Sequence, residues 1–149
     1  MIKHFNIRVY ALIINERMEV LLADEIFRDT RMTKFPGGGM QFGEGTLDCL
    51  RREASEEFGQ ELRITGHFYT TDFFQKSIFH DDHQLISIYY LAAFTGPLSF
   101  RVSTQVFDFT GDGDQQSFRW KSVSLLTPDD LTLPIDKKVA AMLQDHFNL

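Results

Sequence analysis

Apolar and polar residues alternate along the first part of the chain. The apolar members of this pattern are Phe5, Ile7, Val9, Ala11 and Ile13. A period of two residues is typical of a β-strand. Polar residues 15–17 can turn the chain into a second apolar run at residues 18–22. The pattern therefore predicts a β-hairpin over residues 5–22.

A helical period replaces the alternation at two later places. In residues 46–58 the apolar side chains fall within about 80° of arc at 100° per residue, which predicts an amphipathic helix capped by Thr46 and ended by Gly59. In residues 134–147, after Pro134, a second helix is predicted from apolar positions at 3.6-residue spacing. The apolar positions of the two helices are Leu47, Leu50, Ala54, Phe58, and Ile135, Val139, Met142, Leu143, Phe147.

The remaining segments predict strands and loops. Residues 62–74 and 85–94 are long strands joined by a polar segment, and residues 118–123 form another strand. Residues 35–39 read Phe-Pro-Gly-Gly-Gly, which predicts a loop because proline and glycine disfavour regular structure. Strands interspersed with helices, without any linker or repeat, indicate one α/β (α+β) domain over residues 1–149 with a mixed β-sheet.

Composition narrows the class of protein. The 149 residues are 43% hydrophobic, and the longest apolar run, residues 89–94, is far below the roughly 18 residues of a membrane span. The one cysteine, Cys49, has no partner for an intrachain disulfide. The first eight residues lack an apolar stretch of signal-peptide length. We therefore expect a cytoplasmic protein with no membrane partner.

The charge balance bears on the binding partners. Fifteen Lys and Arg against 21 Asp and Glu give a formal net charge of −6, and the basic residues are scattered. A nucleic-acid partner is therefore not expected, since nucleic-acid-binding proteins carry a basic patch. A small phosphorylated ligand remains compatible with this balance, because a divalent metal held by carboxylates supplies positive charge locally.

Three glutamates on the first predicted helix suggest such a metal site. Glu53, Glu56 and Glu57 have i, i+3, i+4 spacing and point away from the middle of the apolar stripe. Two such charges about 5 Å apart repel by about 3 kcal/mol at an effective dielectric near 20, so the cluster favours a cation. The hard cations Mg²⁺ and Mn²⁺ take oxygen ligands of this kind. The alternative is a solvated helix face, the commoner role of a Glu-rich stretch.

The glycines before this helix supply a second feature of the same site. Without β-carbons, Gly37, Gly38 and Gly39 let backbone groups approach a metal or phosphate closely. From Gly38 to Gln60 the chain reads G-x5-E-x7-R-E-A-x-E-E-x-G-Q. This segment resembles the signature of the Nudix hydrolases, G-x5-E-x7-R-E-U-x-E-E-x-G-U, where U is apolar. It departs from it only in the small Ala54 and the polar Gln60.

The resemblance implies a Nudix-like α/β/α sandwich and a fixed set of roles. Nudix hydrolases use divalent metal to cleave a pyrophosphate bond in a nucleoside diphosphate linked to another moiety. Glu56 and Glu57 match the paired metal ligands, and Glu53 matches a glutamate that ligates metal and in some members takes a proton from water. Arg52 matches the arginine that orients these carboxylates. Glu44 matches a structural glutamate, and the carbonyl of Gly37 or Gly38 matches the backbone ligand.

Several alternatives stay open beside this assignment. A small nucleotide is the expected substrate, with a nucleotide sugar or ADP-ribose favoured over a nucleoside triphosphate. The competing function is a catalytically silent nucleotide-binding regulatory module, which the complete set of metal-site residues disfavours. The oligomeric state is open, the homodimer being common among soluble oligomers and in this family.

Three segments outside the signature were also weighed. The residues before the last predicted strand could add a further polar group to the site, although Asp112-Gly113-Asp114 is typical of a surface turn. Residues 80–83, His-Asp-Asp-His, indicate a solvated loop and are left out of the site. Cys49 has no local sign of an activated thiol. The candidates of the first segment are Asp112, Asp114, Gln115 and Gln116.

Overall fold

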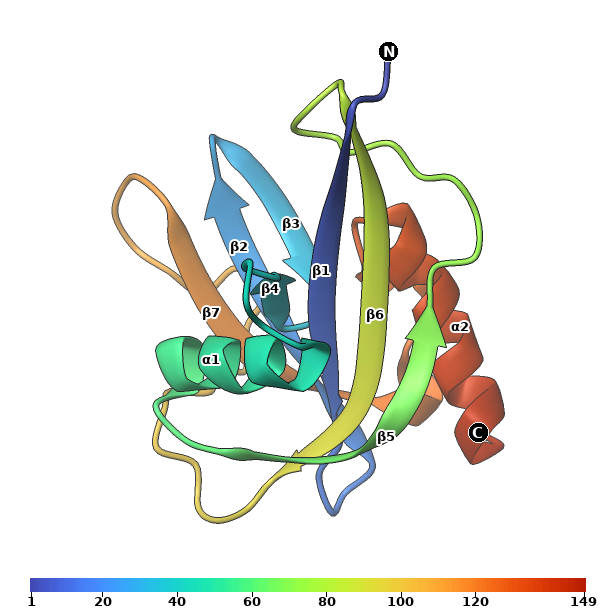
Figure 1. The fold of residues 1–149 in the computed structure, drawn as a ribbon. Helices are drawn as coiled ribbons and strands as arrows, with labels where there is room; N and C mark the ends of the chain where they lie inside the picture. The colour runs from blue at the N-terminus through green and yellow to red at the C-terminus, as the bar shows by residue number, and fades with distance from the viewer.

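The computed structural model describes residues 1–149 as seven strands and two α-helices (Figure 1). Two 3-10 turns, at Val123–Leu125 and Pro128–Asp130, precede the last helix. None of the helices is both long enough and apolar enough to cross a membrane. In chain order the elements are β1 (His4–Ile13), β2 (Glu19–Phe27), β3 (Thr30–Lys34), β4 (Gly37–Gly39), α1 (Thr46–Phe58), β5 (Leu62–Thr70), β6 (His83–Phe94), β7 (Gln115–Ser122) and α2 (Pro134–Phe147).

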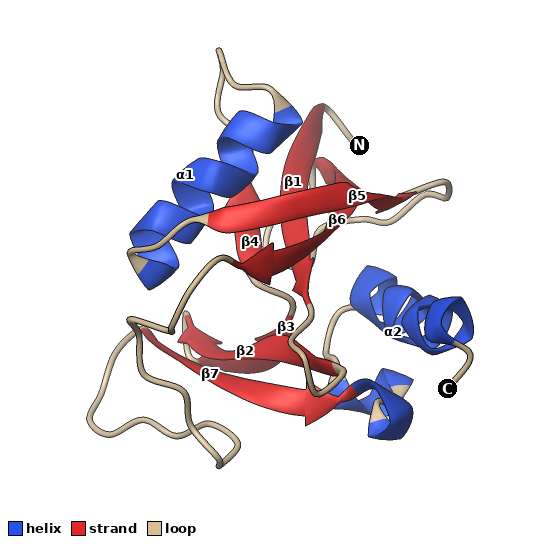
Figure 2. Ribbon diagram, turned by 90° about the horizontal axis from the view of Figure 1, so that it is seen from below, coloured by secondary structure: helices blue, strands red, loops and turns tan.

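The strands form two sheets. One has the order β4-β1-β6-β5, with β1 and β6 parallel and the other neighbours antiparallel, which confirms the predicted mixed sheet. The other is antiparallel, with the order β3-β2-β7. Figure 2 shows the two sheets as separate layers, with α1 and α2 on different sides of them.

Strands β1 and β2 are buried on both faces, because each contributes to two cores. Tyr10 and Leu12 pack in the core that contains the apolar face of α2. Val9, Ala11 and Ile13 pack in the core that contains the apolar face of α1. Successive strand residues point to opposite faces, so one strand serves both cores. This arrangement agrees with the sandwich that the resemblance implied.

The predicted β-hairpin over residues 5–22 is wrong. Strands β1 and β2 lie in different sheets, and only the bridge between Ile14 and Val20 joins their ends. The reason is that both edges of β1 are already paired, one with β4 and the other with β6. The true hairpin partner of β2 is β3, which no sequence pattern predicted. Its two-residue turn uses Arg28 and Asp29 with φ of 49° and 62°, without the glycine that usually marks such turns.

The loop predicted at residues 35–39 is also partly wrong. Gly37–Gly39 form strand β4, which pairs with residues Arg8 to Tyr10 of β1. The glycines extend here because β1 provides their hydrogen-bond partner, an effect that local propensity does not contain. Gly37 has φ of 150°, and a β-carbon there would overlap the backbone of Val9. Glycine therefore permits the close approach of the two strands.

Helix α1 has the predicted extent but a different N-cap. Gly45, not Thr46, is the N-cap, and its N–H donates to Asp48 Oδ2 at 2.8 Å. The hydroxyl of Thr46 instead lies 2.7 Å from that of Tyr90. Gly59 ends the helix in the left-handed conformation, with φ of 64°, as predicted.

The other predicted elements are confirmed with shifted ends. Helix α2 has the predicted bounds. Strand β5 ends at Thr70 rather than at residue 74, because the chain then leaves the sheet and runs back to β6 as an irregular segment. Strand β6 starts two residues earlier than predicted, and β7 is shifted toward Gln115.

Candidate active site

The glutamates of α1 and the glycines of β4 meet in an open cleft of about 440 Å³. Helix α1 runs beside β4, as Figure 1 shows. Because i and i+4 positions share a helix face, Glu53 and Glu57 both line the cleft together with Gly37–Gly39. Glu56 does not line it, since its side chain is 58% exposed at the rim. The structure thus brings two of the three predicted glutamates into one cavity.

Arg52 connects these carboxylates to the loop before α1. Its guanidinium forms a two-pronged ion pair with Glu44, with Nε–Oε2 at 2.6 Å and Nη2–Oε1 at 3.0 Å. Nη1 donates to Glu53 Oε1 at 3.1 Å and reaches Glu56 Oε2 at 3.3 Å. Nη2 also donates to the carbonyl of Gly39 at 2.9 Å. The pKa of Arg52 is raised, first by the hydrogen bond to Glu44, so the group stays charged.

These contacts give Arg52 and Glu44, which both lie outside the cleft, different roles. The geometry suits Arg52 to orienting Glu53, because a planar guanidinium holds its partners in fixed directions. The hydrogen bond from Arg52 lowers the pKa of Glu44 below its usual range. Glu44 therefore anchors the guanidinium as a carboxylate and lies away from the cleft.

Glu57 is a poorly solvated carboxylate of the cleft. Burial raises its pKa to about 7, although the nearby charge of Lys34 acts in the opposite direction. Its Oε2 atom is buried and has no hydrogen-bond partner. A buried carboxylate oxygen without a donor carries a free-energy cost, and a cation would remove it.

The donor set fits a hard divalent cation, although no closed cage of ligands is present. Within the chain, no group of three or more His, Cys, Asp or Glu side chains is arranged to hold a metal. The side chains of the protein itself partly neutralise the acidic groups: Arg52 contacts Glu53 and Glu56, and Lys34 pairs with Glu25. Lys34 Nζ also donates to the carbonyl of Gly37 at 3.2 Å. The oxygens themselves, carboxylate and carbonyl, are the type that Mg²⁺ and Mn²⁺ prefer.

Gly38 makes room for Glu53. A β-carbon at Gly38 would overlap the carboxylate of Glu53, whereas one at Gly39 would meet only Arg8 Nη1 at 3.6 Å. Glycine at position 38 is therefore required for the carboxylate to lie against the strand.

The polar residues before β7 divide between site and surface. Asp114, Gln115 and Gln116 line the cleft, whereas Asp112 does not. Gln116 Nε2 donates to Glu25 Oε2 at 2.9 Å, and Asp114 accepts from the backbone N–H of Arg28 at 3.3 Å.

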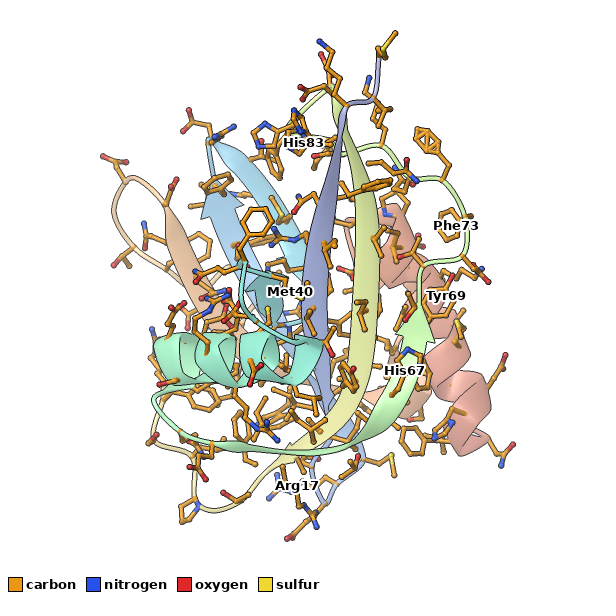
Figure 3. All side chains as sticks on the ribbon, viewed as in Figure 1. Arg17, Met40, His67, Tyr69, Phe73 and His83 are labelled. Carbon is orange, nitrogen blue, oxygen red and sulfur yellow. The ribbon has the colours of Figure 1, made fainter.

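Two other side chains lie outside the chemistry of the cleft. Figure 3 places His83 near the N-terminal end of the chain, away from α1. None of residues 80–83 lines the cleft, although His80 lines a separate, more enclosed pocket. Burial raises the pKa of Cys49 to about 11, which keeps its thiol protonated.

Sequence patterns missed three charged residues of the cleft, namely Arg8, Glu25 and Lys34. Lys34 is 6% exposed and pairs with Glu25 at 3.1 Å. Burial alone would lower the pKa of Lys34, but Tyr10 and Glu25 outweigh this effect and raise it. Arg8 Nε donates to Tyr10 Oη at 2.7 Å. The sequence signal for these residues was a charged side chain at an inward-facing strand position. Such a signal does not say which site the side chain belongs to.

A second, more enclosed pocket of about 290 Å³ adjoins the cleft, and Asp136 is part of its wall. The two cavities share Arg8, Glu25, Phe27 and Lys34. Asp136 is 1% exposed. At about 100° per residue it lies on the helix arc between Leu143 and Phe147, inside the apolar face. A charged residue on that arc was the sequence signal for this pocket.

Comparisons with known proteins agree with this geometry. The family model described as NUDIX domain matches residues 4–143. An RNA pyrophosphohydrolase from Ruthia magnifica subsp. Calyptogena magnifica is 40% identical over 55 residues, which are 37% of this chain and 30% of that protein. The chain therefore matches less than a third of that relative's length.

Solved structures extend the likeness over the whole fold. The MutT protein from Methanosarcina mazei Go1 has a TM-score of 0.72 at 19% identity, covering 100% of this chain and 99% of that one. A NUDIX hydrolase from Nitrosomonas europaea has a TM-score of 0.68 at 16% identity, covering 95% and 89%. Because the family model spans most of the chain and two glutamates of the signature segment line the cleft, the protein belongs to the NUDIX family, the Nudix hydrolases.

Proposed function

We propose that the protein hydrolyses a pyrophosphate bond in a small nucleotide, using Mg²⁺ or Mn²⁺. The substrate is a nucleoside diphosphate linked to another moiety, such as a nucleotide sugar or ADP-ribose, or a nucleoside triphosphate. The observation that carries the proposal is the meeting of Glu53 and Glu57 with Gly37–Gly39 in one cleft. The orphan oxygen of Glu57 supports it, because that atom has an acceptor position to offer a cation.

The residues that would hold the metal are Glu53, Glu56, Glu57 and the backbone carbonyl of Gly37 or Gly38. When bound, the metal supplies charge that polarises phosphoryl oxygens and activates water. Glu56 contacts Arg52 in the structure, so its participation requires its side chain to turn from the rim toward the cleft.

The chain's own groups perform the remaining tasks. Arg52 keeps Glu53 oriented through the contact between Nη1 and Oε1. Glu53 and Glu57 are carboxylates within the cleft that can accept the proton lost by an attacking water. Lys34 and Arg8 line the cleft as cations, so they are placed to attract the negative phosphates of the substrate.

A substrate panel tests the proposal. Product release is measured for ADP-ribose, nucleotide sugars, dinucleoside polyphosphates, nucleoside triphosphates and a 5′-triphosphorylated RNA, with Mg²⁺, Mn²⁺ or EDTA. The RNA arm is included because the Ruthia relative carries that activity in its name. We expect turnover of a small nucleotide only with metal, and a loss of at least about a hundredfold in Glu57→Gln, because the isosteric amide carries no charge for the metal.

Glu61→Gln is the matched control, since Glu61 is exposed on the same segment and lies outside the cleft. It should retain wild-type turnover. Full activity of Glu57→Gln in metal would contradict the proposal. Binding of nucleotides without turnover would instead favour the regulatory module. The cytoplasmic location and the homodimer remain proposals; the burial of the single Cys49 agrees with a reducing compartment.

A further inference from the structure

Lys34, the last residue of β3, places a buried ammonium group at the wall of the cleft. The residue is only 6% exposed, so its charge depends on partners within the chain. Its Nζ has two such partners, the carboxylate of Glu25 at 3.1 Å and the backbone carbonyl of Gly37 at 3.2 Å. The second partner matters for the chemistry, because this carbonyl is one of the candidate metal ligands.

The pairing of β4 with β1 sets the direction of this carbonyl. The carbonyl of Pro36 accepts a hydrogen bond from the N–H of Ala11 on β1 at 2.8 Å. Successive carbonyls of a strand point to opposite sides, so the next one, of Gly37, points away from β1. The carbonyl of Gly39 follows the same alternation and accepts from Arg52 Nη2 at 2.9 Å. Cationic side chains therefore hold both outward carbonyls of β4.

The ammonium of Lys34 serves the acidic cleft only in part. Its charge acts on the carboxyl of Glu57, yet Glu57 Oε2 has no hydrogen-bond partner. Glu57 and Gly37 line the same cleft, so one cation could contact an oxygen of each. A divalent cation on the Gly37 oxygen would lie close to Nζ, where two positive charges repel strongly. The metal and the ammonium therefore exclude each other from this carbonyl.

The surroundings of Lys34 allow its ammonium to leave the carbonyl without becoming an isolated charge. Glu25 remains as an ion-pair partner, and the ring of Tyr10 lies 5.4 Å from Nζ, within the range of a cation–π contact. Lys34 and Glu25 also line the adjoining pocket, so there is space on the side away from Gly37.

We infer that Lys34 is an internal counter-cation that competes with the divalent metal for the carbonyl of Gly37. The inference rests on the proposed function, because it concerns the metal site of the same cleft. Lys34 balances the charge of the carboxylates when no metal is bound, and it makes the metal bind less tightly than those carboxylates alone would allow. Metal binding turns the ammonium from Gly37 toward Glu25.

The test measures metal affinity directly, without nucleotide and without turnover. Mn²⁺ is titrated into the whole protein, and free Mn²⁺ is counted by the electron paramagnetic resonance signal of the hydrated ion. Lys34→Met removes the charge at similar side-chain length, and we expect it to bind Mn²⁺ at least about tenfold more tightly than wild type. Lys121→Met is the matched control, because Lys121 is also a strand lysine paired with a carboxylate, Asp130 at 3.6 Å, but lies outside the cleft. It should bind Mn²⁺ as wild type does.

Two further variants locate the effect. Lys34→Met leaves Glu25 unpaired, and this freed charge would itself attract Mn²⁺. In a Glu25→Gln background no such charge exists, and Lys34→Met should still tighten binding by about tenfold. This pair of variants also decides the question if Lys34→Met alone does not fold, since it leaves no unpaired charge. Adding Glu57→Gln to Lys34→Met should abolish the gain, because the ion binds in the cleft.

The inference and the proposed function fail in different ways. Equal or weaker Mn²⁺ binding in Lys34→Met, or no gain in the Glu25→Gln background, overturns the role of Lys34. Weaker binding would mean that the ammonium supports the metal site by holding the Gly37 carbonyl in place. Metal-dependent hydrolysis with unchanged affinity in Lys34→Met overturns this inference only. Tighter Mn²⁺ binding without hydrolysis of any substrate overturns the proposed function only.

Discussion

Glu53 in the open cleft and Asp136 in the enclosed pocket are partnered in opposite ways. In the cleft, Glu53 is surrounded by charged groups and touches a guanidinium, and the cavity is open to solvent. In the pocket, Asp136 is fully buried and bonds to the neutral phenol of Tyr89. Burial raises the pKa of Asp136 to about 6, an effect that the charge of Lys34 and the bond from Tyr89 only partly offset.

This difference teaches how one chain separates two tasks. A charge-paired carboxylate that borders an open cleft, such as Glu53, can exchange its guanidinium partner for a cation without losing all charged neighbours. A fully buried carboxyl such as Asp136 has no such exchange available, and burial favours its neutral form instead. The first arrangement suits reaction chemistry, whereas the second makes the protonation of the carboxyl part of the stability of the fold.

The largest effect should come from closing the space beside Glu53. In Gly38→Ala the new β-carbon overlaps the Glu53 carboxylate and displaces it. We expect metal-dependent turnover to fall by about a hundredfold, the scale of loss for a 1 Å misplacement of a reacting group. Steady-state kinetics measures the loss. Gly39→Ala, whose β-carbon meets only Arg8 Nη1 at 3.6 Å, is the control and should stay within about threefold of wild type; equal losses in the two variants would contradict the role of Gly38.

A smaller effect should distinguish the pocket by its pH dependence. The pKa of Asp136 is about 6 when folded against a usual value of 3.8, so the folded state binds the proton more tightly. The stability linked to this proton is complete below pH 4 and is lost as the pH rises through 6. Asp136→Asn cannot titrate there. Its unfolding free energy relative to wild type should therefore improve by about 2 kcal/mol between pH 4 and pH 8.

Urea unfolding of both proteins across this pH range measures the difference. Asp129→Asn is the control, because Asp129 is exposed and makes no ion pair in the structure. It should track the wild-type curve. Parallel curves for Asp136→Asn and wild type would show that Asp136 is not buried as described.

The smallest effect should come from the residue that links the cleft to its supporting loop. Arg52→Lys keeps the charge but loses the two-pronged pair with Glu44 and the fixed direction toward Glu53. We expect turnover to fall by about tenfold, with nearly unchanged stability. Kinetics and thermal unfolding measure both quantities. Arg51→Lys, at an exposed position without an ion pair, is the control and should behave as wild type. An equal loss of turnover in Arg51→Lys would contradict a specific role of the Arg52 guanidinium.

The sequence predicted the cleft better than the pocket, because the candidate metal-binding residues of the cleft come from one short segment. Residues 38–60 contain the glycine, the arginine and the glutamates, so their spacing alone indicated one site, and the helix bounds followed from periodicity and Gly59. The third glutamate, Glu56, faces the rim because Arg52 holds it, a side-chain choice that spacing does not contain.

The predictions that failed share a different cause, because the structure at those places depends on pairing between distant parts of the chain. The glycines of β4 form a strand only because β1 lies beside them, and β1 leaves β2 only because β6 takes its other edge. Lys34 at the end of β3 and Asp136 in the first turn of α2 line the same cavity, although they are far apart in the chain. The local sequence pattern shows a charged residue at an inward position in each case, but only the tertiary arrangement shows which cavity the residue lines.

The parallel pairing of β1 with β6 also constrains how the molecule folds. His4 pairs with His83 and Ile13 with Ala92, so these partners are about 80 residues apart along the chain. Pairing β1 with β6 closes a large loop of the chain, and the entropy lost in closing this loop opposes formation of the central strand pair of the mixed sheet. During synthesis, a nascent chain that ends before residue 94 holds β1 and the signature helix without the strand that completes their sheet. Maturation of the cleft is thus tied to the second half of the chain, although its signature residues, 38–60, all lie in the first.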